Sequence, residues 1–144
     1  MHDLMQHPLI LAYGESNEFG KLLGMHFQIH DFGVVEYTLT VEKKHLATPT
    51  SAHGGLIASL LDATVGVAAL STVCMDGKVI STVEMNMTFL APALENDQLK
   101  CISEVVKKGN RLIFMSAKIL NQNDTQIAQC SAILNAYPKE KAGY

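Results

Sequence analysis

The spacing of apolar side chains changes along the chain and separates strand-like segments from one helical segment. In residues 34–42 apolar and polar side chains alternate, as is typical of a strand with one buried face. Met25–His30 is predicted to be the preceding strand, and a turn at residues 31–33 joins the two. Gly33 is expected to take the left-handed conformation that such a turn needs.

The second half of the chain returns to the alternating pattern. Three strands are predicted near residues 97–107, 111–120 and 126–136, after one whose buried face holds Val83, Met85, Met87 and Phe89. Short connections rich in turn-forming residues indicate that neighbouring strands run antiparallel. Ahead of all the strands, a short helix is predicted over Ser16–Leu23, with Ser16 as its N-cap and Gly24 at its end.

Between the two strand regions lies one long apolar segment, from His53 or Gly54 to Val73, which is predicted to be a helix. Its apolar side chains point in nearly every direction, so every side of it must be covered. One curved sheet covers about half of such a helix, and we expect a second copy of the chain, in a homodimer, to cover the rest. A membrane span is not favoured, because the carboxylate of Asp62 near the middle would cost about 2.5–3.5 kcal/mol there.

Composition and charge narrow the function classes. The 144 residues predict a single domain over 1–144, with a helical segment over about 1–23 and a core over about 24–137. A net charge of −3 leaves no basic excess for nucleic acid, so no nucleic-acid partner is expected. Three widely spaced cysteines predict reduced thiols, and the first residues do not resemble a signal peptide, so a cytoplasmic location is expected. No metal site is expected either, because His26 and His30 have no third ligand at a suitable spacing.

One row of small or polar residues recurs along the long helix at helical spacing, namely Gly55, Ser59, Asp62, Gly66 and Ala69. The small members allow either close helix packing or the approach of a thin ligand. Packing alone does not explain Asp62, because an ionised carboxylate on an apolar helix is costly unless it is hydrogen-bonded or used in chemistry. A carboxylate surrounded by Leu, Val and Ala is poorly solvated, which should make it a stronger base.

His53-Gly54-Gly55 opens this helix, and an acid follows nine residues after the histidine. This pattern resembles the hotdog-fold acyl-CoA thioesterases, and within them the phenylacetate-degradation (PaaI-like) group. Residues 81–92, 108–111 and 127–130 are similar to the same group, so the likeness covers about residues 24–137. The resemblance implies an α+β hotdog fold, in which a curved antiparallel sheet of five to six strands surrounds one long central helix. It also implies acyl-CoA as the substrate, no cofactor, and dimers with joined sheets, of which we expect two to associate.

The resemblance assigns roles to particular residues. The Gly54 N–H would bind the thioester carbonyl oxygen, Asp62 would act as general base or nucleophile, and Thr82 would lie near the attacking water. Gly55 and Ser59 are expected to contact the substrate. The chain departs from the family pattern at two positions, because members commonly carry Asn where it has Ala47 and Gly where it has Thr50.

Elementary physics favours the same arrangement. An N–H at a helix N-terminus faces the negative charge that builds on a thioester oxygen, and glycine lets the substrate come close. Gly54 and Asp62 lie eight residues apart, about 12 Å along the helix axis, so one cannot hold a carbonyl group that the other attacks. If both act on one substrate, Gly54 of one protomer must work with Asp62 of its partner.

Other polar residues keep two interpretations. His53 either positions the substrate region or only caps the helix, and a Ser51–His53–Asp62 triad is not favoured because nothing indicates a nucleophile elbow. Lys108 and Arg111, with Lys107, form either a solvated turn or a site for the phosphates of coenzyme A.

The leading hypothesis is hydrolysis of an acyl-CoA thioester by water. The alternative is an acyl-CoA-binding module without activity, which Ala47 favours. A hydratase on a related fold is a third option, for which the chain shows no accompanying Asp/His pattern.

Overall fold

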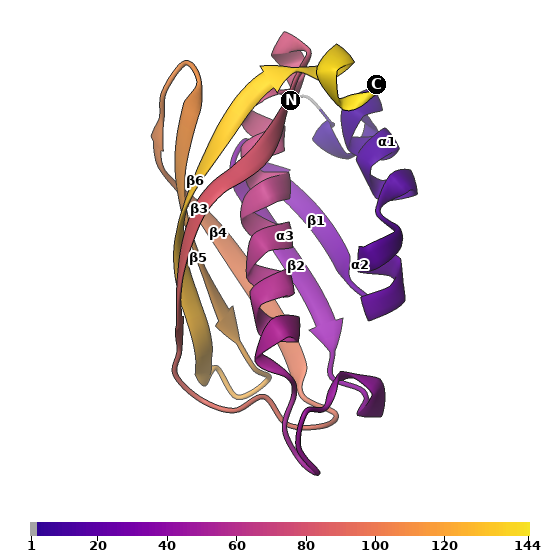
Figure 1. Cartoon of the computed structure of the whole chain (residues 1–144), viewed down its shortest axis with the longest axis vertical. Helices are drawn as coiled ribbons and strands as arrows, with labels where there is room; N and C mark the ends of the chain where they lie inside the picture. Colours follow the sequence, from indigo (N-terminus) through magenta and orange to yellow (C-terminus); the bar gives the residue numbers. More distant parts are fainter. Residues whose placement is uncertain (1–2) are drawn as a thin grey trace.

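Six antiparallel strands form one sheet that packs on a long helix in the computed structural model, which describes residues 3–144 (Figure 1). The strands are β1 (His26–Asp31), β2 (Val34–Thr40), β3 (Lys78–Phe89), β4 (Gln98–Lys108), β5 (Leu112–Leu120) and β6 (Gln126–Pro138). Their order across the sheet is β1-β2-β4-β5-β6-β3, and the helix, α3 (Gly54–Val73), packs against every strand. The predicted hotdog arrangement is confirmed, with six strands. The turn before β2 is also as predicted, with Gly33 at φ +75°.

The side of α3 that faces the sheet forms the centre of the core. Leu60, Leu61 and Val65 are completely buried, and burying each such side chain stabilises the fold by roughly 1.5–3 kcal/mol. The region Gly54–Asp76 is long and apolar enough to cross a membrane, but 67% of its apolar window is buried inside this domain. We therefore assign α3 as the core helix of the fold.

The other side of α3 carries the row of small and polar residues. Gly55 and Asp62 are exposed, and Ser59 and Gly66 are half-buried. Ala69 is completely buried, because the row turns into the core as the helix proceeds, and at this position close packing is the interpretation that holds. The open part of the row therefore runs from Gly55 to Gly66.

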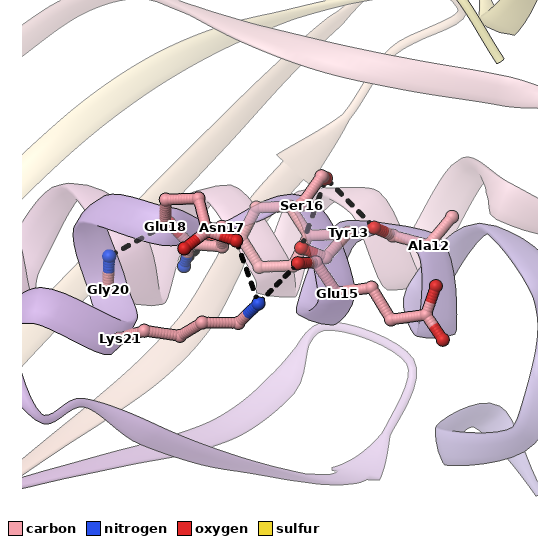
Figure 2. A network of polar contacts seen from close by, with 8 residues as sticks. All are labelled: Ala12, Tyr13, Glu15, Ser16, Asn17, Glu18, Gly20 and Lys21. Atoms are coloured by element: carbon pink, nitrogen blue, oxygen red, sulfur yellow. Dashed lines mark hydrogen bonds and ion pairs between the residues drawn. The ribbon is translucent and has the colours of Figure 1, made fainter.

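Two helices precede the sheet where one was predicted. They are α1 (Pro8–Ser16) and α2 (Glu18–Leu23), and Gly24 ends α2 with φ +78° as expected. Ser16 does not cap the second helix, because it lies in the last turn of α1 and its hydroxyl donates to the Ala12 carbonyl at 2.8 Å (Figure 2). Asn17 is the N-cap instead, and its side-chain oxygen accepts the Gly20 N–H at 3.1 Å.

A β-bulge in β3 changes which side chains face the helix. Thr82 pairs with Leu134, and Glu84 with the next residue of β6, so Val83 is left without a partner. Met85, Met87 and Phe89 pair with buried alanine and cysteine positions of β6, and Met85 and Met87 are half-buried. The prediction of a buried side chain was wrong for Val83 and Phe89, which are 61% and 54% exposed. The extra residue shifts the alternation by one, so that Thr82 also faces α3.

β3 forms one edge of the sheet. Among the described residues it pairs with β6 alone, and its other edge leaves backbone N–H and C=O groups unpaired. Large apolar side chains near this edge are exposed, at 61% for Val83, 54% for Phe89 and 52% for Leu90. An edge strand of this length with exposed apolar residues is suited to pairing with another chain.

Candidate active site

Asp62 and Thr82 meet across the gap between α3 and β3. The Thr82 hydroxyl donates to Oδ1 of Asp62 at 2.7 Å. The second carboxylate oxygen, Oδ2, accepts no hydrogen bond from residues 3–144. The expected burial of this carboxylate is wrong for the single chain, because Asp62 lies on the open side of α3 and is exposed. One oxygen is therefore held in place while the other is free for water or substrate.

A cleft of about 360 Å³ adjoins this pair, and we call it the Asp62 cleft. Besides Asp62 and Thr82, its walls include Gly66, Tyr13, Tyr137 and Tyr144. Sequence reasoning missed the three tyrosines, since they come from α1, β6 and the C-terminal residues and no local pattern connects them.

The N-terminus of α3 presents a backbone donor. His53 is the N-cap, and its Nδ1 accepts the Gly55 N–H at 2.7 Å, which places the proton of the neutral ring on Nε2. The Gly54 N–H donates to no group within residues 3–144. A Cβ at Gly54 would come no closer than 3.7 Å to Phe89, an ordinary contact, so packing within the chain does not require glycine there. The free N–H and the open backbone are thus available to a ligand.

His45, a buried histidine, supports the start of α3. It is 4% exposed; its Nδ1 accepts the Glu42 N–H at 2.9 Å, and its Nε2 lies 3.0 Å from the Leu23 carbonyl oxygen. Its backbone carbonyl accepts the His53 N–H at 2.8 Å. A buried histidine between α2 and the start of α3 therefore fixes the residue that caps the helix.

Gly54 lies in a different cleft from Asp62. The Gly54 cleft, of about 440 Å³, is lined by Ser51, Ile57, Phe89 and neighbouring apolar residues, and it shares no residue with the Asp62 cleft. The two groups lie on one rigid helix about 12 Å apart along its axis. Within one chain they do not form a single site.

The remaining predicted residues are spread over other places. Gly55, Ser59 and His53 border a third cleft, beside α2, and the Ser59 hydroxyl donates to the Gly55 carbonyl at 2.7 Å. Ser51 contacts the Thr48 hydroxyl at 2.6 Å, so it forms no triad with His53.

The basic residues lie at the opposite end of α3 from Gly54. Lys108 donates from Nζ to the Thr72 carbonyl at 2.8 Å, in the last turn of the helix. Arg111 donates from Nε to the Asn135 side chain at 2.9 Å. Both side chains are exposed and each uses one donor within the chain, which leaves others for a ligand.

The three cysteines do not belong to the site. All are buried and unbonded to one another, and burial raises the pKa of Cys101 to about 12 and that of Cys130 to about 11. These thiols stay protonated near neutral pH and are poor nucleophiles.

Known proteins resemble both the sequence and the fold. The model of the thioesterase superfamily matches residues 50–128, which include Gly54, Asp62 and Thr82. Human acyl-coenzyme A thioesterase 13 is 28% identical over 116 residues, 79% of this chain and 81% of that protein. The structure of the E. coli PaaI protein from the phenylacetic acid degradation operon superposes with a TM-score of 0.85 at 25% identity, over 93% of both chains. A hypothetical thioesterase from Streptococcus pneumoniae, solved with coenzyme A, has the same fold, with a TM-score of 0.72 at 22% identity over 79% of this chain and 86% of that one.

Proposed function

Because the chain belongs to the thioesterase superfamily, we propose that it hydrolyses acyl-CoA thioesters at a site that two protomers share. The activity has the same class as that named for the human relative. The observation that carries the shared site is the separation of two complementary groups, the free Gly54 N–H and the Asp62–Thr82 pair, into different clefts of one chain.

Gly54 supplies the electrostatic half of the reaction. Attack on a thioester places negative charge on the former carbonyl oxygen, and a free N–H at the positive end of a helix stabilises that charge. The His53 ring takes the Gly55 N–H and leaves that of Gly54 unused, so the substrate meets one donor with a fixed direction.

Asp62 supplies the basic half. With Oδ1 held by Thr82, Oδ2 either removes a proton from a water molecule beside the thioester carbon or attacks that carbon itself. The thiolate of coenzyme A is a good leaving group, so a general acid is less needed than in ester or amide hydrolysis.

The exposed edge of β3 offers the means of bringing two protomers together. Its unpaired backbone groups and its exposed Val83, Phe89 and Leu90 suit pairing with a second copy of the same strand. Such pairing obeys two-fold symmetry and places α3 of one protomer antiparallel to α3 of the other. The Gly54 end of each helix then approaches the middle of its partner, where Asp62 lies.

One feature favours a second function on the same scaffold, an acyl-CoA-binding module without activity. Ala47 stands where the resemblance leads us to expect Asn, and its N–H is used within the loop, donating to the Ser51 carbonyl at 3.0 Å.

The release of free thiol from a panel of short, medium, long and aromatic acyl-CoAs distinguishes the two functions. We expect turnover by the native chain, and a loss of at least about 10³-fold in kcat for Asp62→Asn, which keeps the size of the side chain but removes the base. Tight binding of acyl-CoA without turnover by the native chain would identify the module instead.

A further inference from the structure

Aromatic residues gather around the Asp62 cleft. The chain has four tyrosines, and three of them, Tyr13, Tyr137 and Tyr144, line this cleft. The fourth, Tyr37, is buried and its hydroxyl lies 3.4 Å from that of Tyr13. Asp62 is the single charged side chain in the lining, and aliphatic side chains such as Leu70 and Ile80 stand beside the tyrosine rings.

Tyr13 is held rigidly in this wall. Its hydroxyl accepts from Nδ2 of Asn17 at 3.1 Å and contacts the Tyr37 hydroxyl. Its ring lies 6.0 Å from that of Phe27, which in turn lies 5.2 Å from Tyr37. Burial raises the pKa of Tyr13, so the phenol stays neutral. Because the hydroxyl is engaged by Asn17 and Tyr37, the ring is the part of Tyr13 that remains for contact with an apolar ligand.

The junction of α1 and α2 fixes Tyr13 in this position. Asn17 uses both ends of its side chain, since Oδ1 caps α2 while Nδ2 reaches Tyr13. A Cβ at Gly20 would collide with the Asn17 side chain, so glycine leaves the space that this side chain needs. Lys21 bonds to the Glu15 carbonyl and pairs with Glu18, which closes the junction (Figure 2).

The composition of the cleft indicates which part of a thioester it receives. The thioester carbon must lie beside Asp62, with the acyl group on one side and coenzyme A on the other. A lining with a carboxylate and no cation is unfavourable for the phosphates of coenzyme A. An apolar acyl group fits the aromatic and aliphatic wall, and removing it from water is favourable.

We propose that the Asp62 cleft binds the acyl group and that Tyr13 is a specificity-determining residue, which restricts the substrate to apolar chains of medium length. The inference rests on the proposed function. From Asp62 to Leu70 the cleft follows α3 for eight residues, about 12 Å. An extended alkyl chain advances about 1.3 Å along its axis for each carbon–carbon bond, so that length takes a chain of up to about ten carbon atoms.

The test compares kcat/KM for octanoyl-CoA and palmitoyl-CoA. The native chain should prefer octanoyl-CoA. Tyr13→Ala removes the aromatic ring from the lining of the cleft. The ratio of the two kcat/KM values should then shift toward palmitoyl-CoA by about tenfold. With acetyl-CoA as a third substrate, Gly66→Ala should shift the preference toward a shorter chain, from octanoyl-CoA to acetyl-CoA, because its new methyl group occupies the cleft while meeting only Ile80 at 3.7 Å.

Two control variants test whether the aromatic ring of Tyr13 itself sets the chain-length preference. Tyr13→Phe retains the ring and should keep the native length preference. Leu11→Ala changes an exposed residue of α1 outside the cleft and should also leave the preference unchanged. Thermal melting of each variant verifies that it is folded, and Gly66→Ala tests the cleft even if Tyr13→Ala does not fold.

The outcomes are distinguishable. Opposite shifts in Tyr13→Ala and Gly66→Ala support the proposal. Active variants with the native ratio overturn the role of Tyr13 and the cleft but leave the thioesterase function standing. A native chain that hydrolyses no acyl-CoA overturns the proposed function, and the acyl specificity falls with it.

Discussion

The two halves of the proposed site are built in different ways. At the start of α3, residues 53–55 make the donor group by themselves, with the His53 ring capping one N–H and leaving the next one free. In the middle of the helix, Asp62 depends on Thr82, twenty residues away, and on a β-bulge that turns Thr82 toward the helix. A helix terminus needs only local sequence to create an anion site, whereas a positioned carboxylate needs tertiary structure.

Removing the free Gly54 N–H should lower the activity more than the other two changes described below. Gly54→Pro deletes this one donor at the first position of a helix, where proline is well tolerated. His53 already has φ −63° and ψ 137°, the conformation that a residue before proline prefers. We expect kcat to fall by about 10²–10³-fold in the thiol-release assay, with the melting temperature unchanged or raised.

Gly54→Ala is the matched variant, because it adds a methyl group that fits beside Phe89 and keeps the N–H. It should lose less activity than Gly54→Pro. Native rates in Gly54→Pro would show that this N–H takes no part in the reaction.

Removing the hydroxyl that holds Asp62 should have a smaller effect on the second half. Thr82→Val keeps the shape of the side chain but no longer donates to Oδ1. Because the base remains and only its orientation is lost, we expect kcat to fall by about tenfold with little change in KM. Thr82→Ser is the control and should retain most of the activity. A loss in Thr82→Ser as large as that in Thr82→Val would indicate that packing of the methyl group matters and the hydrogen bond does not.

The smallest effect is expected at the helix cap. His53→Ala leaves the Gly55 N–H without its partner at 2.7 Å and should lower the free energy of unfolding by about 1 kcal/mol, measured by denaturant titration. His53→Asn restores a capping acceptor and should recover that stability. If stability recovers in His53→Asn while activity does not, the Nε2 side of the ring has a role beyond capping.

The fold and the start of α3 were predictable because their patterns are local. The alternation of apolar residues located every strand, and the all-apolar helix located the core. The glycine turns at Gly24 and Gly33 have the left-handed backbone that the sequence indicated.

The wall of the cleft was not predictable, since it depends on contacts between distant segments. Tyr13 reaches the cleft because Asn17, and not Ser16, begins α2, and both residues are suitable caps in a sequence. The exposure of Val83 likewise depends on a bulge, which the alternation of residues 83–89 does not reveal. The burial of His45 between α2 and the helix start is a third long-range effect.

Mixing two inactive variants tests the shared site most directly. Gly54→Pro and Asp62→Asn are purified separately, combined in equal amounts and allowed to exchange subunits. Each mixed dimer then holds one site with an intact Gly54 from one protomer and an intact Asp62 from the other. Since half of the dimers are mixed after random exchange, about one quarter of the native thiol-release activity should return. No recovery, in a mixture where exchange is demonstrated by mass spectrometry, would contradict a site built from two protomers.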